Sequence, residues 1–418
     1  MSNYVATVVK IPMIQPIEGA DKIGLVQILG ENIIVSKDSD LSATYLLFLS
    51  GTQLAPEYLK ANNLYQKSEN NADVTKKGYF SDKGVVSSVK LKGIISTAFL
   101  MPISSLESIV NTSKLKIGDE FEEIAGFKLC WKYEKPVKLH VHGTGNPVKK
   151  EFKLSDLIVK GQFKFHDETE SFARNLHKFK ENDIVVILRK KHGSSCILSH
   201  VLVNNKLSWF QKKWNKIPFL PSFKTVDYGY LWSSGKPKSR LVKGISTGWM
   251  NPNESYYSQN IWKTAFDDYK HTLEKGISIY SELVASNIQK GYNYGHPEGT
   301  YGMYVYRITK TDEFSNTVEF SWQQIKDYCK KYNLLHVEEY YHGRYGDITS
   351  SNILKYLTDK YLGKKCLDCI NKNLPDEGIV IRFDGNLNAF NAFKLKDKNF
   401  ILKETQQLED DTIVNEES

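Results

Sequence analysis

The sequence predicts an α+β protein with a β-rich region over residues 1–130 and a larger mixed domain after it. Two observations support this fold class. Short apolar runs separated by glycine, proline, aspartate and asparagine fill the first 130 residues, which is typical of strands joined by turns. Beyond residue 155, apolar strands alternate with helical stretches such as 321–333. Many short strands at this spacing favour a small barrel or sandwich for the first region.

The elements follow in order along the chain. We expect six strands in the first region, at residues 4–11, 24–30, 32–36, 45–50, 85–93 and 96–103. The polar segment 67–84 interrupts them and is expected to be an exposed loop. Proline, glycine and lysine without periodicity indicate a linker at 131–155. The second domain then spans 156–405, and an acidic, frayed tail spans 406–418.

Composition limits the class of protein. The 418 residues are 41% apolar and 12% aromatic, enough for the cores of two or three domains. Lysine and arginine exceed aspartate and glutamate by 56 to 48, and this net charge of +8 suits a polyanionic partner. No run reaches the ~18 to 20 apolar residues of a membrane span, and the N-terminus lacks the blocks of a signal peptide. We therefore expect a cytoplasmic protein without a membrane partner.

The five cysteines are an odd, scattered set. In a reducing compartment such a set makes a disulfide framework improbable. Cys366 and Cys369 form a C-x-x-C, but no second pair or histidine cluster lies near them in the sequence. We interpret them as a helical pair rather than a zinc site.

The stretch RKKHGSS (189–195) directly follows the apolar run DIVVIL. Strand alternation places Lys190 on the side of Val186 and Leu188, so its amine has apolar neighbours. Desolvation and nearby cations lower a lysine's pKa from ~10.4, which is how a lysine becomes a nucleophile near neutral pH. Gly193 would let the backbone approach a ligand. The alternative is a solvated, basic strand end followed by a turn. Only the presence of partner residues elsewhere in the sequence can distinguish a nucleophile from this alternative.

Partners occur downstream. Glu282 lies inside the apolar run ISIYSELV, Glu377 heads PDEGIVIRF, and Lys394 and Lys396 share one face of NAFKLKDKNF. A carboxylate within a strand costs several kcal/mol unless it is paired, hydrogen-bonded or near a metal. Together these residues supply what nucleotidyl transfer needs: an attacking amine, acceptors for ribose and Mg²⁺, and cations for the phosphates.

These motifs resemble the covalent nucleotidyltransferases, which comprise ATP-dependent ligases and mRNA capping enzymes. K-x-[DH]-G matches Lys190–Gly193, a strand glutamate matches Glu282, and the aromatic strand that follows is similar to 303–309. E-G-x-V matches 377–380 and K-x-K matches 394–396. Four motifs in this order over more than 200 residues make the resemblance specific. It implies an ATP-grasp-like ligase domain of antiparallel sheets with flanking helices.

The histidine in K-x-H-G resembles RNA ligases of the nick-sealing type, and FKFHDETESFARN (163–175) resembles the segment that precedes this motif in many of them. Residues 4–30 and 85–106 look like the N-terminal OB module of Deinococcus-type RNA ligases. The resemblance therefore implies an OB-like β-barrel over 1–130. DNA ligases and capping enzymes carry an OB domain after the last motif, whereas only residues 397–418 follow here.

The resemblance also implies roles for single residues. Lys190 attacks ATP and forms lysyl-AMP, and AMP then passes to an RNA 5′-phosphate that the adjoining 3′-hydroxyl attacks. Glu282 contacts the ribose, Glu377 holds Mg²⁺ (or Mn²⁺), and Lys394 and Lys396 neutralise the phosphates. Further cofactor-binding residues are expected to be Gly193, Tyr304 and Arg240.

Several departures from the family pattern affect these roles. Arg189 stands where related ligases often have glutamate, and Arg240 is delayed relative to an S-S-R-like turn. Lys191 competes with Lys190 as the nucleophile, but the glycine spacing and the strand alternation favour Lys190. Residues 250–300 form an additional segment without an assigned role.

We expect a monomer that binds RNA or an RNA-containing nicked duplex. Lys90 and Lys92, with Tyr79 and Phe80, are available on the OB-like module for phosphates and bases. Two alternatives remain: a DNA ligase or guanylyltransferase of the same superfamily, and a nucleic-acid-binding protein on a degenerate ligase scaffold.

Overall fold

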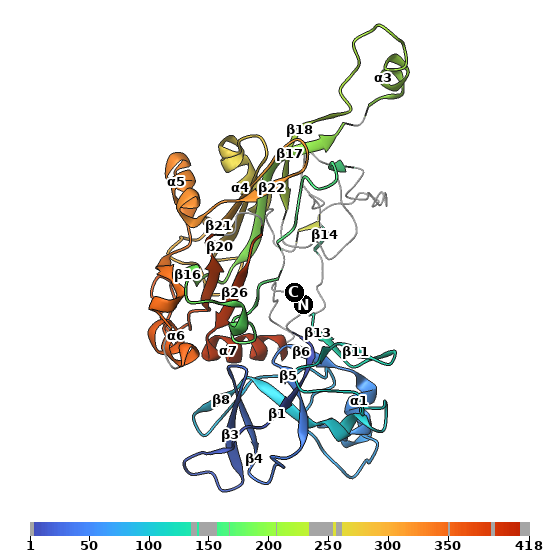
Figure 1. Ribbon diagram of the computed structural model, residues 1–418, viewed down its shortest axis with the longest axis vertical. Coiled ribbons are helices and arrows are strands. Elements are labelled where there is room, and N and C mark those ends of the chain that lie inside the picture. Colours follow the sequence, from blue (N-terminus) through green and yellow to red (C-terminus); the bar gives the residue numbers. More distant parts are fainter. Residues whose placement is uncertain are drawn as a thin grey trace.

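The computed structural model describes residues 4–134, 140–141, 157–166, 168–205, 207–233, 254–255, 261–349, 352–385 and 389–409. These residues form a mixed α+β structure of mostly antiparallel sheets with a few helices at their faces (Figure 1). The predicted fold class is confirmed. Expected features outside these ranges are Arg240, most of the linker, part of 250–300 and the tail beyond Glu409.

The first module consists of small antiparallel sheets, and each of its paired strands is antiparallel to its neighbour. Its strands are β1 Ala6–Lys10, β2 Gln15–Pro16, β3 Ile23–Ile28, β4 Glu31–Ser36, β5 Thr44–Leu49, β6 Thr52–Leu54, β7 Val89–Leu91, β8 Ile94–Ser96, β9 Ala98–Pro102, β10 Glu120–Phe121, β11 Glu123–Ile124, β12 Phe127–Lys128 and β13 Cys130–Lys132. Its helices are α1 Pro56–Ala61, η1 Ser68–Asn70 and η2 Ile103–Leu106. Among the strands that the structure describes, the pairings close no barrel, so the OB-like barrel stays a prediction.

Two sheets make up the second module. The first has the order β15-β26-β25-β16-β24 and the second β18-β17-β20-β21-β22, with β23 beside β21. Their strands are β15 Glu170–Ser171, β16 Ile184–Lys190, β17 Ser194–Asn204, β18 Val226–Ser233, β20 Ile277–Ala285, β21 Tyr301–Thr311, β22 Thr317–Glu319, β23 Leu335–His336, β24 Glu339–Arg344, β25 Gly378–Phe383 and β26 Ala392–Lys396. A separate pair joins β14 His140–Val141 and β19 Glu254–Ser255. Strands β16 and β17 belong to different sheets and only three residues join them.

The helices flank these sheets. They are η3 Leu176–Lys178, α3 Trp209–Trp214, α4 Ile261–Tyr269, η4 Lys270–Thr272, α5 Trp322–Tyr332, η5 Tyr345–Asp347, α6 Ile353–Tyr361 and α7 Lys398–Glu409. None of the helices in the described ranges is long and apolar enough to cross a membrane.

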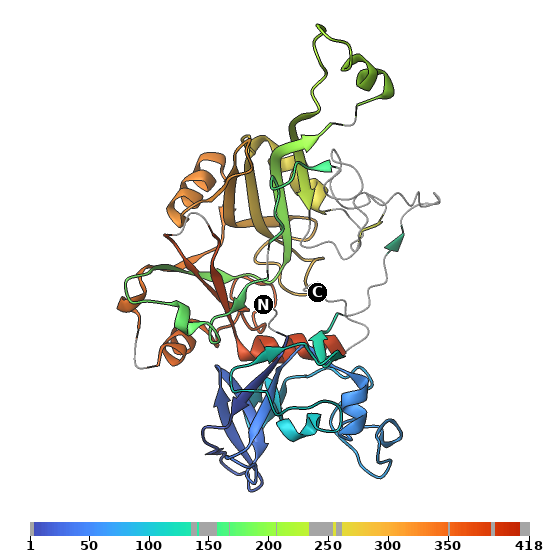
Figure 2. The same cartoon turned by 45° about the vertical axis from the view of Figure 1, so that its right-hand side comes forward.

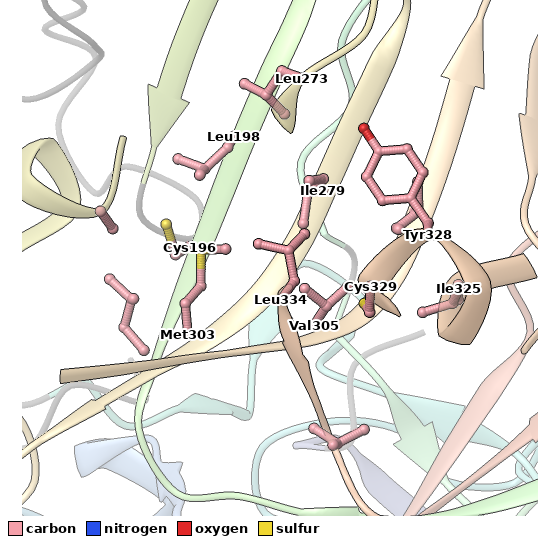
Figure 3. Packing of buried hydrophobic residues seen from close by; sticks show 14 of the residues in the cluster. Cys196, Leu198, Leu273, Ile279, Met303, Val305, Ile325, Tyr328, Cys329 and Leu334 are labelled. Atoms are coloured by element: carbon pink, nitrogen blue, oxygen red, sulfur yellow. The ribbon is translucent and has the colours of Figure 1, made fainter. Parts of the chain in front are cut away.

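Helix α5 illustrates how the sequence specifies an element. Ser321 and Gln324 form a reciprocal capping box at its start, and Asn333 ends it in a left-handed conformation. The buried residues Trp322, Ile325 and Cys329 lie three and four positions apart, so they share one face. That face packs on the second sheet, as Figure 3 shows for Ile325 and Cys329 beside Val305.

Helix α7 lies between the two modules (Figures 1 and 2). The backbone N–H of Ser88 donates to Thr405 Oγ1 at 3.2 Å, and Lys83 donates to the Leu408 carbonyl at 3.4 Å. The helix ends at Glu409, so the first four residues of the expected tail are helical. The division into domains at 130 and 155 remains a prediction.

The interpretation of the C-x-x-C as a helical pair was wrong. Cys366 and Cys369 lie in a turn, not in a helix, and they form a disulfide. All five cysteines are buried, and Cys130, Cys196 and Cys329 are free thiols. A disulfide closed within one turn needs only local chain geometry, so an odd and scattered set of cysteines does not exclude it.

Candidate active site

Three strands place two predicted lysines at one level of the first sheet. Lys190 ends β16 and pairs with Gly378 of β25, which pairs in turn with Lys396 of β26. A Cβ added to Gly378 would lie 2.3 Å from the Leu395 carbonyl oxygen, and its φ of +141° also favours glycine. The close approach of β26 and the positive φ therefore require a glycine at position 378, between the two lysines.

The carboxylate of Glu377 joins these lysines. Its Oε1 is 2.6 Å from Lys190 Nζ and 3.5 Å from Lys396 Nζ, and its side chain is fully buried. Lys396 also contacts Glu404 of α7 at 2.9 Å. A buried carboxylate requires such partners, because an unpaired one would cost several kcal/mol. Glu377 Oε2 accepts no hydrogen bond among the described residues, so one buried oxygen remains available to a metal ion.

One level along the same sheet, Val380 pairs with Lys394. Lys394 Nζ donates to Glu168 Oε1 at 3.1 Å. Burial raises the pKa of Glu168, but Lys394, Lys132 and Lys396 together bring it below its ordinary value, so this carboxylate is ionised. Glu168 was not predicted as a site residue, although it lies in the HDETESFARN segment that suggested the family.

The turn after β16 is fixed against the second sheet. Gly193 donates its backbone N–H to Glu282 Oε1 at 3.0 Å. A Cβ on Gly193 would lie 2.2 Å from the Leu283 carbonyl oxygen of β20. The glycine is therefore required by the close approach of protein backbone, and its contact with a ligand stays a prediction.

Lys191, the competing nucleophile, is enclosed. Its side chain has no exposed surface, and its Nζ lies 2.9 Å from Glu338 Oε1. The rings of Tyr294 and Tyr304 cover the same amine with centroids at 4.2 and 4.3 Å. Burial lowers the pKa of Lys191, and Glu338 opposes that shift. Lys190 keeps 19% of its side-chain surface exposed, so it is the more accessible of the two amines.

Tyr304 was predicted to contact the nucleotide. In the structure its ring covers Lys191, and its hydroxyl lies 3.1 Å from His296 Nε2. Burial raises the pKa of Tyr304 to about 12. A nucleotide contact through this ring remains a prediction.

Arg189, which stands where related ligases often have glutamate, is paired with acidic side chains of the chain itself. Its guanidinium donates two hydrogen bonds to Asp368 and three to Asp376, at 2.7 to 3.2 Å. Asp368 lies between the disulfide cysteines and is also 3.6 Å from Lys191 Nζ. This bidentate network fixes the strand end immediately before the nucleophile.

His192 lies in a buried aromatic group. The rings of Tyr292 and Phe400 contact it edge-on, each with centroids 4.9 Å away, and its backbone N–H donates to Tyr294 Oη at 2.7 Å. Lys403 of α7 places its Nζ 4.3 Å from the Tyr292 ring centroid. Burial lowers the pKa of Lys403 to about 8.

The predicted RNA-binding residues of the first module are partly available. Lys90 and Lys92 are exposed on the β7–β8 hairpin. Tyr79 is exposed, but Phe80 is buried against Phe99. The prediction that Phe80 is available to RNA bases was therefore wrong, because this ring fills the module's own core.

Sequence reasoning missed the residues that meet the lysines from distant segments: Glu168, Glu404, Glu338 and Asp368. The contact of the Arg382 guanidinium with the Phe390 ring was also not predicted. Nor was the packing of His166 against Tyr306 and Phe390. Two features of the sequence could have indicated some of these residues. The acidic character of 167–170 indicates Glu168, and strand alternation in β25 places Arg382 on the same face as Val380.

The sequence model of the RNA ligase family matches residues 183–396, about half of the chain and the whole span from β16 to β26. No curated protein matches the sequence.

Solved structures of the RNA ligase from Naegleria gruberi have a similar fold. A lysine-to-methionine variant with AMP and Mn is 14% identical, covers 95% of this chain and 98% of its own, and gives a TM-score of 0.58. The same ligase with PPi covers 97% and 100% at 14% identity, with a TM-score of 0.59. The prediction of a ligase of the nucleotidyltransferase superfamily is confirmed by the family match, and the chain belongs to the RNA ligase family.

Proposed function

We propose that this chain is an ATP-dependent RNA ligase that joins 3′-hydroxyl and 5′-phosphate ends, at nicks in duplexes, through a lysyl-AMP intermediate. The observation that carries the proposal is the arrangement of Lys190, Glu377 and Lys396 on three adjacent strands. An amine beside a buried carboxylate and a second cation suits attack on a phosphorus atom.

In the first step, the Lys190 amine attacks the α-phosphorus of ATP. A nitrogen–phosphorus bond forms, the bond from the α-phosphorus to pyrophosphate breaks, and the amine loses a proton. Glu377 holds the amine in position through the 2.6 Å contact. Lys394 and Lys396, whose carboxylate partners lie at 3.1 and 2.9 Å, supply positive charge to the phosphates.

The remaining steps complete ligation. The 5′-phosphate of RNA attacks the phosphorus of lysyl-AMP and frees Lys190, and the adjoining 3′-hydroxyl then forms the phosphodiester and releases AMP. Glu282 would contact the ribose while it accepts the Gly193 N–H. Arg240, outside the described residues, is proposed to contact the nucleotide.

A divalent cation suits the donors present. The buried Glu377 carboxylate, with Oε2 accepting no hydrogen bond in the described part of the chain, would hold Mg²⁺ or Mn²⁺. Such an ion neutralises phosphate charge during transfer. Solved structures of the Naegleria gruberi RNA ligase contain AMP or ATP with Mn, or PPi, which supports this choice of cofactors.

The test is transfer of label to the protein. Purified protein, first treated with pyrophosphate to remove bound nucleotide, is incubated with Mg²⁺ and α-labelled ATP, GTP or NAD beside Lys190→Ala. Label from ATP alone, absent in Lys190→Ala, is the expected result. Label from GTP would indicate a guanylyltransferase. No label from any nucleotide in folded protein would leave a binding protein on a ligase scaffold.

Substrate choice is tested next on matched nicks with RNA or DNA on each side. We expect sealing of the all-RNA nick, and the mixed nicks show whether the 3′-hydroxyl strand alone or both strands must be RNA. Equal sealing of all-DNA nicks would contradict the RNA assignment.

A further inference from the structure

Residues 205–225 are called the arm, and its described part, Asn205 and residues 207–225, projects from the second sheet. They join β17 to β18, and both views place α3 at the tip, away from the rest of the molecule (Figures 1 and 2). Strands β17 and β18 pair over eight positions, from Ile197–Ser233 to Asn204–Val226. The backbone N–H of Asn205 then donates to the Thr225 carbonyl at 2.8 Å and closes the base of the arm.

The arm has an internal structure. Ser208 and Gln211 form a capping box that starts α3. The Trp214 indole N–H donates to the Pro221 carbonyl at 3.1 Å. Asn215 makes two hydrogen bonds to the Phe223 backbone, at 2.7 and 2.8 Å. These contacts fix the two sides of the arm to each other.

This structure leaves large apolar side chains on the outside. Trp209, Phe210 and Phe219 are exposed by 71%, 61% and 102%, and Ile217, Leu220 and Phe223 are also exposed. Single exposed apolar residues need no explanation, but six within one short segment mark an interaction surface.

The charge of the arm selects the partner. It contains lysines at 206, 212, 213, 216 and 224 and no aspartate or glutamate. Lys213 Nζ lies 4.0 Å from the centroid of the Trp209 ring, so cation and ring form one surface. Lysines interleaved with exposed rings suit a polyanion with flat faces, because phosphates contact the amines and bases stack on the rings.

We propose that the arm binds a single-stranded segment of the RNA substrate by stacking bases on Trp209, Phe210 and Phe219. This rests on the proposed function for the identity of the polyanion. An anionic membrane surface would also accept rings and lysines. RNA is favoured because β17 begins directly after the Gly193 turn and ends at the arm, so one strand connects the RNA-joining site to this surface.

The length of β17 sets which RNA can use both sites. Its eleven residues span roughly 36 Å at ~3.3 Å per residue. RNA that only covers the reacting ends does not reach the arm. The arm therefore strengthens binding of long substrates selectively.

The experiment measures RNA affinity by fluorescence anisotropy. The probe is single-stranded RNA of about 30 nucleotides, longer than the ~4 to 16 nucleotides that one single-strand-binding module covers. Wild type is compared with the combined Trp209→Ala, Phe210→Ala and Phe219→Ala variant. We expect the variant to bind at least about 10-fold more weakly, since each stacked base contributes a measurable share of affinity. A short, fully paired nicked duplex, which offers no unstacked bases to the arm, should show a difference below about 2-fold.

A second variant separates charge from stacking. Lys212→Ala, Lys213→Ala and Lys216→Ala together should reduce the slope of log affinity against log salt by about 2, at ~0.7 per phosphate contact. Phe314→Ala, an exposed ring on the β21–β22 turn, and Lys355→Ala on α6 are the matched controls and should bind as wild type. Circular dichroism melts confirm that each variant is folded.

Three outcomes decide the proposal. Folded arm variants that bind long RNA as tightly as wild type would overturn it. Unchanged RNA binding with loss of flotation on vesicles that contain phosphatidylserine would overturn it in favour of a membrane surface. Arm-dependent RNA binding in a wild-type protein that takes no label from ATP would support the arm and contradict the proposed function.

Discussion

Lys190 and Lys191 are neighbours in the chain, but their surroundings differ. Lys190 meets the fully buried Glu377 and stays partly exposed, whereas Lys191 is enclosed by two tyrosine rings and contacts Glu338. Both amines are paired with carboxylates, so pairing alone does not identify a nucleophile. Access does, because ATP must reach the amine that attacks it.

Removing the carboxylate beside Lys190 should have the largest effect. Glu377→Gln leaves Lys190 and Lys396 without their shared counter-charge and removes the expected metal ligand. We expect labelling by ATP to fall at least about 100-fold. We also expect a loss of about 3 kcal/mol of unfolding free energy, since the pair is buried. Denaturant melts and the labelling assay measure the two effects. Labelling near the wild-type rate would show that Glu377 has a structural role alone.

Displacing the turn after Lys190 should have the next largest effect. Gly193→Ala places a Cβ against the Leu283 carbonyl and must shift the turn. A displacement of about 1 Å at a reacting group costs on the order of 100-fold in rate. Single-turnover labelling measures this. Gly385→Ala, where an added Cβ meets no atom of the described residues within 4 Å, is the control. Equal rates for both variants would contradict the role of the turn.

Replacing the enclosed lysine tests the other half of the comparison. Lys191→Met should lower the unfolding free energy by about 1 to 3 kcal/mol, less than a fully buried pair costs, because Glu338 and Asp368 are partly exposed. Labelling should stay within about 10-fold of wild type if Lys190 is the nucleophile. Abolished labelling in folded Lys191→Met, together with labelled Lys190→Ala, would reverse the assignment.

Lys403 shows how burial changes the pKa of a lysine that no carboxylate pairs with in the described ranges. Replacing it should have the smallest effect of these substitutions. Its Nζ has no hydrogen-bond partner in the described ranges, and burial lowers its pKa to about 8. Between about pH 8 and 10.5, the unfolded state binds more protons at this residue than the folded state, so stability rises with pH. We expect the melting temperature of wild type relative to Lys403→Met to increase from pH 7.5 to 10. A difference independent of pH would contradict the shift.

The sequence predicted the fold class and the lysines and glutamates of the motifs, because strand alternation and motif spacing are local properties. It did not predict their partners. Glu168 lies 226 positions before Lys394, and no local pattern joins them. The arm was also missed, since the exposure of Trp209 or Phe219 depends on what the rest of the fold leaves uncovered. The prediction that Phe80 is exposed to RNA was wrong for the opposite reason, because the core of its own module buries this ring.

The two ends of strand β17 differ in how well they tolerate insertions and changes of sequence. At its start, three residues cross from one sheet to the other and carry the glycine that β20 requires, so an insertion there would break both the crossing and the position of Lys190. At its end, eight paired positions of β17 and β18 isolate residues 205–225 from the sheets. An exchange of the arm would therefore leave the positions of Lys190 and Glu377 unchanged.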